Sequence, residues 1–168
     1  MKVFKHIIAL VIILALTACT KDDTPAYELT SENLSAGTYD ITYLTSNETE
    51  TVNINGLDII TEYSTIGETF QLSVDFFDNG TYVLDGQYVI NTLVTVAGET
   101  VEESTVIVDI DNQQGTYTPN NNSMQLLLDE TLYDVTFFNA NELRLSYSEA
   151  YSEDGVDYFE TEEIRMAR

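Results

Sequence analysis

Cys19 carries the most reactive side chain of this 168-residue chain, and it is the only cysteine. It stands directly after the apolar run from Ile7 to Leu16 and the small residues Thr17 and Ala18. A single cysteine cannot form an intramolecular disulfide bond, so its thiol in an exported protein requires another explanation. Covalent acylation supplies one, because two or more buried acyl chains hold a protein stably at a membrane.

Residues 1–18 have the organisation of a secretory signal peptide. Lys2 and Lys5 provide a positively charged start, and the apolar run is shorter than the ~20 residues that a membrane-spanning helix needs. The motif Leu16-Thr17-Ala18-Cys19 resembles the lipobox of bacterial lipoproteins, whose cysteine is diacylated and becomes the first residue of the mature protein. The resemblance implies that Cys19 anchors the protein in a membrane. An ordinary cleaved signal peptide with an incidental thiol is the alternative.

Lys21, Asp22 and Asp23 follow the cysteine almost at once. They resemble the lysine-plus-acidic tag of Bacteroidota lipoproteins that are displayed on the outer face of the outer membrane. The resemblance implies an outer-membrane lipoprotein at the cell surface, with the periplasmic face as the alternative. Residues 19–33 are polar and show no sustained period, which predicts a lipidated N-terminus and a flexible acidic tether before a domain at 34–168.

The chain is strongly acidic, with a formal net charge of −23 at pH 7. No lysine or arginine occurs between Asp22 and Leu143. Nucleic acids and anionic lipid headgroups are disfavoured as partners, because binding them requires clustered cations. The simplest interpretation of this charge is a solvated acidic surface that keeps an exported domain soluble, and attraction of cationic ligands is the other.

The residue types that are missing narrow the chemistry further. His6 is the only histidine and lies in the expected signal peptide, so the mature chain lacks Ser-His-Asp and Cys-His catalysis and His/Cys zinc sites. The glycine motifs of nucleotide-binding folds are absent as well. The sequence therefore predicts a non-catalytic protein with no cofactor and no metal. A hydrolase that uses carboxylates alone is the remaining enzymatic alternative.

From Leu34 onward the sequence has the pattern of successive β-strands, rich in threonine, valine, isoleucine and tyrosine. Residues 70–76 alternate cleanly between apolar and polar, whereas 47–66 is weakly patterned. Asp78-Asn79-Gly80 is typical of a hairpin turn, and Gly86 within a strand predicts a bend or bulge. The strand patterns and turns together predict an all-β fold, an antiparallel up-and-down meander of about eight strands closed into a barrel. A two-sheet β-sandwich is the alternative closure.

The turns and aromatic residues of this meander resemble those of lipocalin-like domains found in Bacteroidota lipoproteins. The resemblance covers nearly the whole mature chain and rests on four motifs: Gly37-Thr38-Tyr39, Phe76 to Tyr82, Gly115-Thr116-Tyr117 and Asn141 to Tyr147. Tyr39 stands where the family more usually has a tryptophan, a residue that this chain lacks. The long segment 83–112 also predicts strands that project beyond the barrel. The resemblance implies a lipocalin-like barrel with a non-catalytic binding role.

Aromatic and aliphatic residues of one strand parity are the candidates for the barrel interior, namely Tyr39, Tyr43, Phe70, Leu72, Tyr82, Leu84 and Tyr88. Two interpretations stay open: these residues fill a solid core, or they leave a pocket for a small apolar ligand that is uncharged or cationic. The alternative function is an interaction or adhesion module that binds a glycan or a protein through its loops. An internal apolar cavity favours the first function, and a filled core favours the second.

Overall fold

The computed structural model describes residues 27–168, so Cys19, Lys21, Asp22 and Asp23 lie outside the described residues. One short helix, α2 (Ser31–Leu34), precedes eight strands. The strands are β1 (Tyr39–Ile54), β2 (Leu57–Phe77), β3 (Thr81–Val96), β4 (Glu99–Asn120), β5 (Gln125–Leu128), β6 (Thr131–Phe138), β7 (Glu142–Glu153) and β8 (Val156–Ala167). Within this part of the chain, no helix has both the length and the apolar character to cross a membrane.

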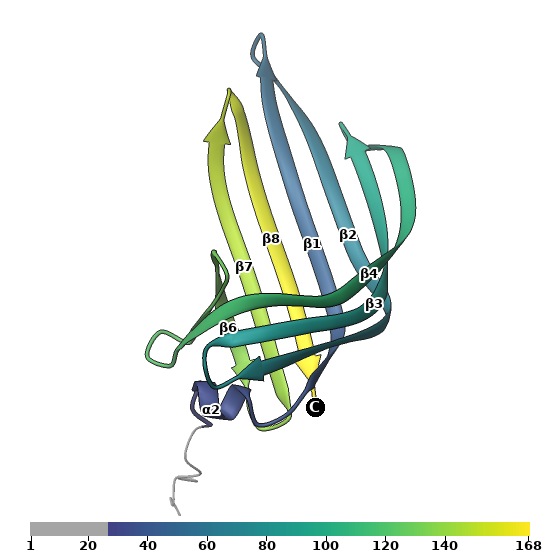
Figure 1. Cartoon of the computed structure of the whole chain (residues 1–168). Coiled ribbons are helices and arrows are strands. Elements are labelled where there is room, and N and C mark those ends of the chain that lie inside the picture. The colour runs from purple at the N-terminus through teal and green to yellow at the C-terminus, as the bar shows by residue number, and fades with distance from the viewer. Residues whose placement is uncertain (1–26) are drawn as a thin grey trace, which may run out of the picture.

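Each strand pairs antiparallel with the next one in sequence, and β8 returns to pair with β1. The result is an up-and-down meander closed into a barrel (Figure 1). The predicted all-β meander of about eight strands is confirmed. The sheet forms a single ring, not the two stacked sheets of the alternative sandwich.

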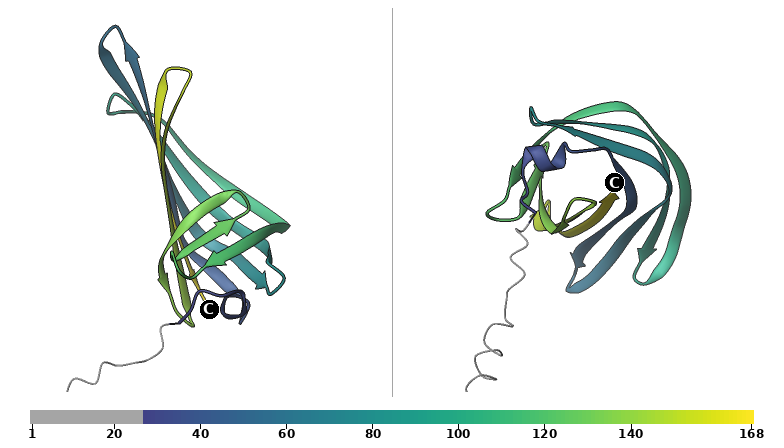
Figure 2. Two further views of the ribbon diagram at one scale, coloured as in Figure 1. Left: turned by 90° about the vertical axis from the view of Figure 1, so that its left-hand side faces the viewer. Right: turned by 90° about the horizontal axis from the view of Figure 1, so that it is seen from below.

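The strands differ greatly in length, and this shapes the molecule. β5 and β6 have 4 and 8 residues, whereas β2 and β4 have 21 and 22. Beyond the reach of β5 and β6 the long strands continue as an open, curved sheet (Figures 1 and 2). The segments 46–54, 57–65, 147–153 and 156–162 are termed the arm, and they pair in the order β7, β8, β1, β2. The face of the arm that continues the barrel interior is its inner face.

A line of β-bulges crosses the sheet where the closed barrel gives way to the arm. The strand register shifts between Ile41 and Tyr43 on β1, between Glu68 and Gln71 on β2, and between Leu84 and Gly86 on β3. The extra residue lies on β1 at the first shift, on β2 at the second, and on β4, between Ile110 and Gln113, at the third. Side chains alternate between the two faces of a strand, so each extra residue reverses the inward parity of its own strand, while β3, β7 and β8 keep theirs.

Strand β1 shows this reversal directly. Before the bulge, the odd-numbered Tyr39 and Ile41 are buried. After the bulge, Leu44 lies opposite the buried Ile164, so the even-numbered residues face inward along the arm. The weak pattern of residues 47–66 has a different cause, because the register is unbroken there and the inward residues are largely polar, such as Glu48, Glu50 and Tyr63.

The segment that precedes β1 caps the closed end of the barrel. Leu29 and Leu34 are 2% and 0% exposed and belong to the core. The Thr30 hydroxyl accepts a hydrogen bond from the Asn33 backbone N–H at 3.2 Å and caps α2. The expected tether at 19–33 therefore extends too far, because its last residues, from Leu29 onward, belong to the folded domain.

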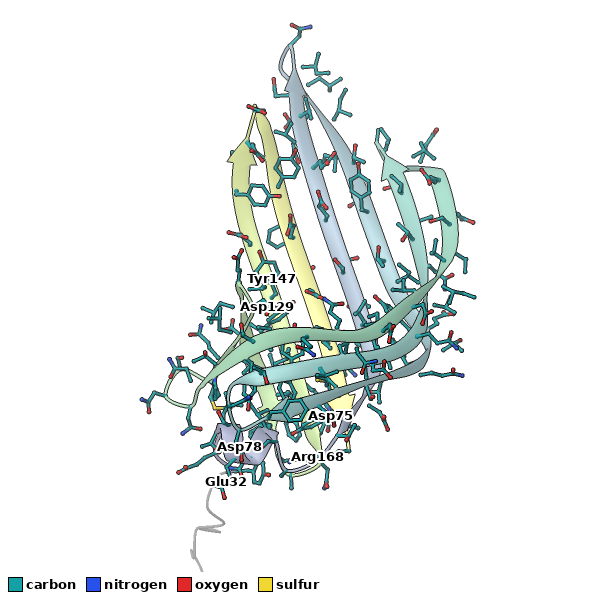
Figure 3. The ribbon with its side chains drawn as sticks, viewed as in Figure 1. Glu32, Asp75, Asp78, Asp129, Tyr147 and Arg168 are labelled. Carbon is teal, nitrogen blue, oxygen red and sulfur yellow. The ribbon has the colours of Figure 1, made fainter. Side chains whose placement is uncertain are left out.

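Arg168 ties this cap to the last strand. Its guanidinium donates to the carbonyl oxygen of Asn33 at 3.1 Å and to the hydroxyl of Tyr27 at 3.0 Å. The same group lies 4.5 Å from the ring centroid of Tyr39. A side chain from the C-terminus thus holds the N-terminal cap and the first strand together at the closed end, close to α2 (Figures 2 and 3).

Gly86 is the residue on which the bend of β3 depends. Its φ of 125° lies in a region that side chains rarely adopt, and a Cβ atom there would lie 1.9 Å from the carbonyl oxygen of Gln71. The bend or bulge predicted at Gly86 is confirmed by the register shift beside it.

Replacing Gly86 with alanine should destabilise the barrel by about 3 kcal/mol or more, since backbone strain and a steric clash act together. Gly98 is the matched control: its φ is 82°, but nothing lies within 4 Å of the added Cβ. Gly98→Ala should cost only about 1–2 kcal/mol, the backbone term alone. Urea unfolding of the two variants measures the difference, and equal midpoints would show that β3 does not approach β2 so closely.

Candidate functional site

The barrel interior contains a cavity of about 250 Å³. Its walls come from opposite sides of the ring and are mostly apolar: Ile41, Val74, Phe76, Tyr82, Leu84, Leu128, Ile164 and Met166, together with Asp129, Thr131 and Tyr133. Small-molecule sites are typically apolar with a few polar groups that fix the orientation of the ligand. This cavity has that composition.

Asp129 forms the polar end of the cavity, in the turn between β5 and β6 (Figure 3). Its carboxylate accepts hydrogen bonds from the backbone N–H of Thr116 at 2.7 Å and from the Tyr82 hydroxyl at 2.8 Å. These bonds hold the pKa of Asp129 below its usual value. Burial, followed by the bond to Asp129, raises the pKa of Tyr82 to about 12. At neutral pH a phenol therefore donates to a carboxylate, and the polar end carries negative charge.

The residues expected to line the interior fall into four groups, of which Tyr43 alone forms the last. Tyr82 and Leu84 line the cavity, whereas Tyr39 and Leu72 are buried in the core without lining it. Phe70 and Tyr88 stack on each other with ring centroids 5.9 Å apart and pack against the core.

Tyr43 lies on the outer face of the barrel, not in the interior as expected. It pairs with Arg165, whose guanidinium lies 4.5 Å from the centroid of the Tyr43 ring. Arg165 stands between Ile164 and Met166, which are both buried, so Arg165 and its cross-strand partner face outward. The bulge on β1 is the cause, because it moves Tyr43 off the parity of Tyr39.

Nine of the eleven lining residues were not among the expected ones: Ile41, Val74, Phe76, Leu128, Asp129, Thr131, Tyr133, Ile164 and Met166. The alternation of apolar and polar residues along β6 and β8 was the available signal for the last three. Asp129 had no such signal, because a turn residue has no strand parity and its role depends on a contact with Tyr82 on a distant strand.

The inner face of the arm is lined with glutamates and tyrosines. One row across the strands contains Glu149, Glu160, Glu48 and Tyr63, and the next row toward the tip contains Tyr151, Tyr158 and Glu50. Tyr147 and Glu162 form the row nearest the barrel. These residues face inward because Ile164, two positions after Glu162 on the same strand, is buried in the core.

Tyrosine hydroxyls connect this face to the cavity. Tyr133, which lines the cavity, donates to Glu162 at 2.7 Å, and its ring centroid lies 5.9 Å from that of Tyr147. Further along the arm, the Tyr151 hydroxyl donates to Glu160 at 2.7 Å. The cavity and the inner face of the arm therefore adjoin, and Tyr147 and Asp129 lie where they meet (Figure 3).

The arginines of the described residues lie elsewhere. Arg144 and Arg165 pair with Glu142 at 2.6 Å and with Glu163 at 2.7 Å, both beside buried residues and so on the outer face. Arg168 is at the closed end. The glutamates of the arm thus face one another without a cation, and like charges directly opposite on neighbouring strands are destabilising.

Comparison with known proteins returns no relative: no protein-family model, curated protein or solved structure matches this chain. Within residues 27–168, no group of three or more histidine, cysteine, aspartate or glutamate side chains is arranged to hold a metal ion. Two features of the described residues have binding chemistry, the cavity and the inner face of the arm.

Glu48→Gln should stabilise the folded chain at pH 7 by about 0.2–1 kcal/mol, because it removes one member of a like-charged row. Burial, then the Glu160 and Glu50 carboxylates, raise the pKa of Glu48. A carboxyl whose pKa is raised in the folded state holds its proton more tightly there than in the unfolded chain. Its contribution to stability therefore falls as the pH rises from below the unfolded-state pKa to above the folded-state pKa. The gain of Glu48→Gln should therefore vanish in acid, where Glu48 is protonated in the parent chain as well.

Thermal unfolding across a pH series measures this effect, with Glu68→Gln on the outer face as the control. A Glu48→Gln variant that is no more stable than the parent at pH 7, or one equally stabilised at all pH values, would contradict repulsion within the row.

Proposed function

We propose that this chain is a lipid-anchored, non-catalytic binding protein of the outer membrane that holds a small apolar molecule in its barrel. The observation that carries the proposal is the cavity of about 250 Å³ inside a closed ring. A barrel of about eight strands either fills its interior or holds one small ligand, and this barrel leaves space. An apolar cavity of about 150 Å³ is enough to bind benzene, so a ligand somewhat larger than benzene fits here.

The charge around the cavity narrows the ligand to an uncharged or cationic molecule. Asp129 supplies a carboxylate at one end, and no arginine or lysine is among the lining residues. An anionic headgroup at that end would face the like charge of the exposed Asp129 carboxylate, with no cation among the lining residues. An apolar body with a neutral hydrogen-bonding group or an amine matches both ends of the cavity.

The proposal of a lipid anchor rests on the N-terminal sequence. Leu16-Thr17-Ala18-Cys19 predicts lipidation, and Lys21-Asp22-Asp23 predicts display at the cell surface. The fold suits this arrangement. Tyr27 packs against Phe138 at the closed end, with ring centroids 5.0 Å apart, and the chain enters the barrel there (Figure 1). Tyr27, the first described residue, therefore lies at the end of the barrel opposite the arm.

Filling the cavity should weaken ligand binding without unfolding the barrel. Leu84→Phe adds volume inside the cavity, whereas Leu132→Phe adds the same ring type at an outer position that is 50% exposed. Titration with an environment-sensitive hydrophobic dye should saturate for the parent and for Leu132→Phe. Leu84→Phe should weaken binding about tenfold or more, equivalent to about 1.4 kcal/mol.

Mass spectrometry of the purified parent chain provides a second measurement, since a tightly held ligand co-purifies. Saturable dye binding that is equally strong in both variants would show that the dye binds outside the barrel cavity. Absence of saturable binding in the parent would overturn the proposal.

Lipidation is tested by metabolic labelling with a clickable fatty acid. The parent chain should incorporate the label and Cys19→Ser should not, because the chain has no second thiol. Protease added to intact cells should digest the parent, and replacing Lys21, Asp22 and Asp23 with alanine should protect it. Equal labelling of the parent and Cys19→Ser would contradict the anchor, and protection of the parent would place it on the periplasmic face.

A further inference from the structure

The arm distributes its charged and aromatic residues unequally between its two faces. All of its tyrosines face inward: Tyr63, Tyr147, Tyr151 and Tyr158. The inner face also carries Glu48, Glu50, Glu149, Glu153, Glu160 and Glu162. The outer face is mostly uncharged and consists largely of threonine, serine and asparagine, as at positions 47, 49, 51 and 53 of β1. Acidic residues that serve solubility alone would function on either face, so their concentration on one face indicates a specific use.

The inner face is accessible in the described structure. Its four strands contact chiefly their own neighbours in the sheet, and the arm stands clear of the barrel in two views (Figures 1 and 2). The glutamates nearest the barrel are half-buried, and those on β7 are exposed. The face is thus an unpartnered sheet surface of strongly negative charge.

The tip of the same face is apolar. Ile54 and Leu57 flank the β1–β2 turn, with 50% and 68% of their surfaces exposed. Val52 and Ile59 form the next pair toward the barrel and also face inward. Exposed apolar side chains that lie together beside a charged surface are a feature of protein interaction sites. This apolar tip is independent of the acidic rows and also indicates a partner.

We infer that the inner face of the arm is a docking surface for an extended, basic segment of a partner protein. A surface of carboxylates beside tyrosine rings suits lysine and arginine side chains. These form ion pairs with the carboxylates and cation–π contacts with the tyrosine rings. No arginine of residues 27–168 lies on this face and this range contains no lysine, so charge complementarity favours a cationic partner. This inference goes beyond the ligand in the barrel and uses different residues.

The spacing of the rows favours an extended segment over a compact cation. Glu162, Glu160 and Tyr158 follow one another at every second position of β8. Same-face side chains of an extended peptide repeat at about 6.8 Å, the spacing of these rows along the strand. Alternate basic residues can therefore meet successive rows, and an apolar residue beyond them reaches the tip at Ile54 and Leu57.

The test uses the full mature chain in detergent and a fluorescein-labelled peptide of sequence Lys-Thr-Lys-Thr-Lys-Thr-Lys, followed by anisotropy. Binding should saturate with one peptide per chain. The triple variant Glu48→Gln, Glu149→Gln, Glu160→Gln should bind about tenfold more weakly. The control triple Glu68→Gln, Glu103→Gln, Asp109→Asn makes the same change in net charge at exposed outer positions of β2 and β4 and should bind like the parent.

Loss of fold does not account for the expected result, because removing like charges from one row should leave the first triple at least as stable as the parent. Equal weakening by both triples would mean unspecific attraction to an acidic protein and would overturn the inference. Equal binding of a peptide with its lysines in one block would overturn the extended arrangement. Leu84→Phe should leave peptide binding unchanged, so failure of the barrel site and failure of the arm site give different results.

Discussion

The line of bulges where the barrel ends is the constraint on which both candidate sites depend. It bends the sheet, and it reverses the inward parity of β1 and β2 between the closed ring and the arm. Below the bulges the inward residues of β1 and β2 are apolar and enclose the cavity, as with Ile41 and Val74. Above them the inward residues are Glu48, Glu50 and Tyr63. The inner face of one sheet therefore has an apolar part in the ring and an acidic part in the arm. A register slip of one residue would turn these inward side chains to the outer face of the sheet.

The parts of the fold that the sequence predicted well are those in which one side of the strand is apolar throughout. Residues 70–76 are an example, and Leu72, Val74 and Phe76 are all buried. The arm escaped recognition because glutamate, tyrosine and threonine alternate there without an apolar row. Tyr43 was misplaced because a bulge between Ile41 and Tyr43 leaves no mark in composition. Gly86 was recognisable because only glycine tolerates both the positive φ and the approach of Gln71.

Closure of the ring places a special demand on the ends of the chain. Every strand pair except β1–β8 joins neighbours in sequence, so the last pairing must bring together segments separated by almost the whole domain. Such long-range contacts form slowly, because the entropy of closing a long loop is lost before the contact stabilises it. The interactions of Arg168 with Asn33, Tyr27 and Tyr39 lie at this seam. They add hydrogen bonds and a cation–π contact where closure has the largest entropic cost.

The shortness of β5 and β6 has a consequence for how copies of this chain behave together. Among the described residues, β4 pairs with β5 only through 117–120, and β7 pairs with β6 only as far as Ser146. Residues 99–115 and 147–153 thus present backbone edges, which are templates for strands of other molecules. Glu102, Glu103, Glu149 and Glu153 lie along those edges, and their mutual repulsion keeps like edges apart at neutral pH.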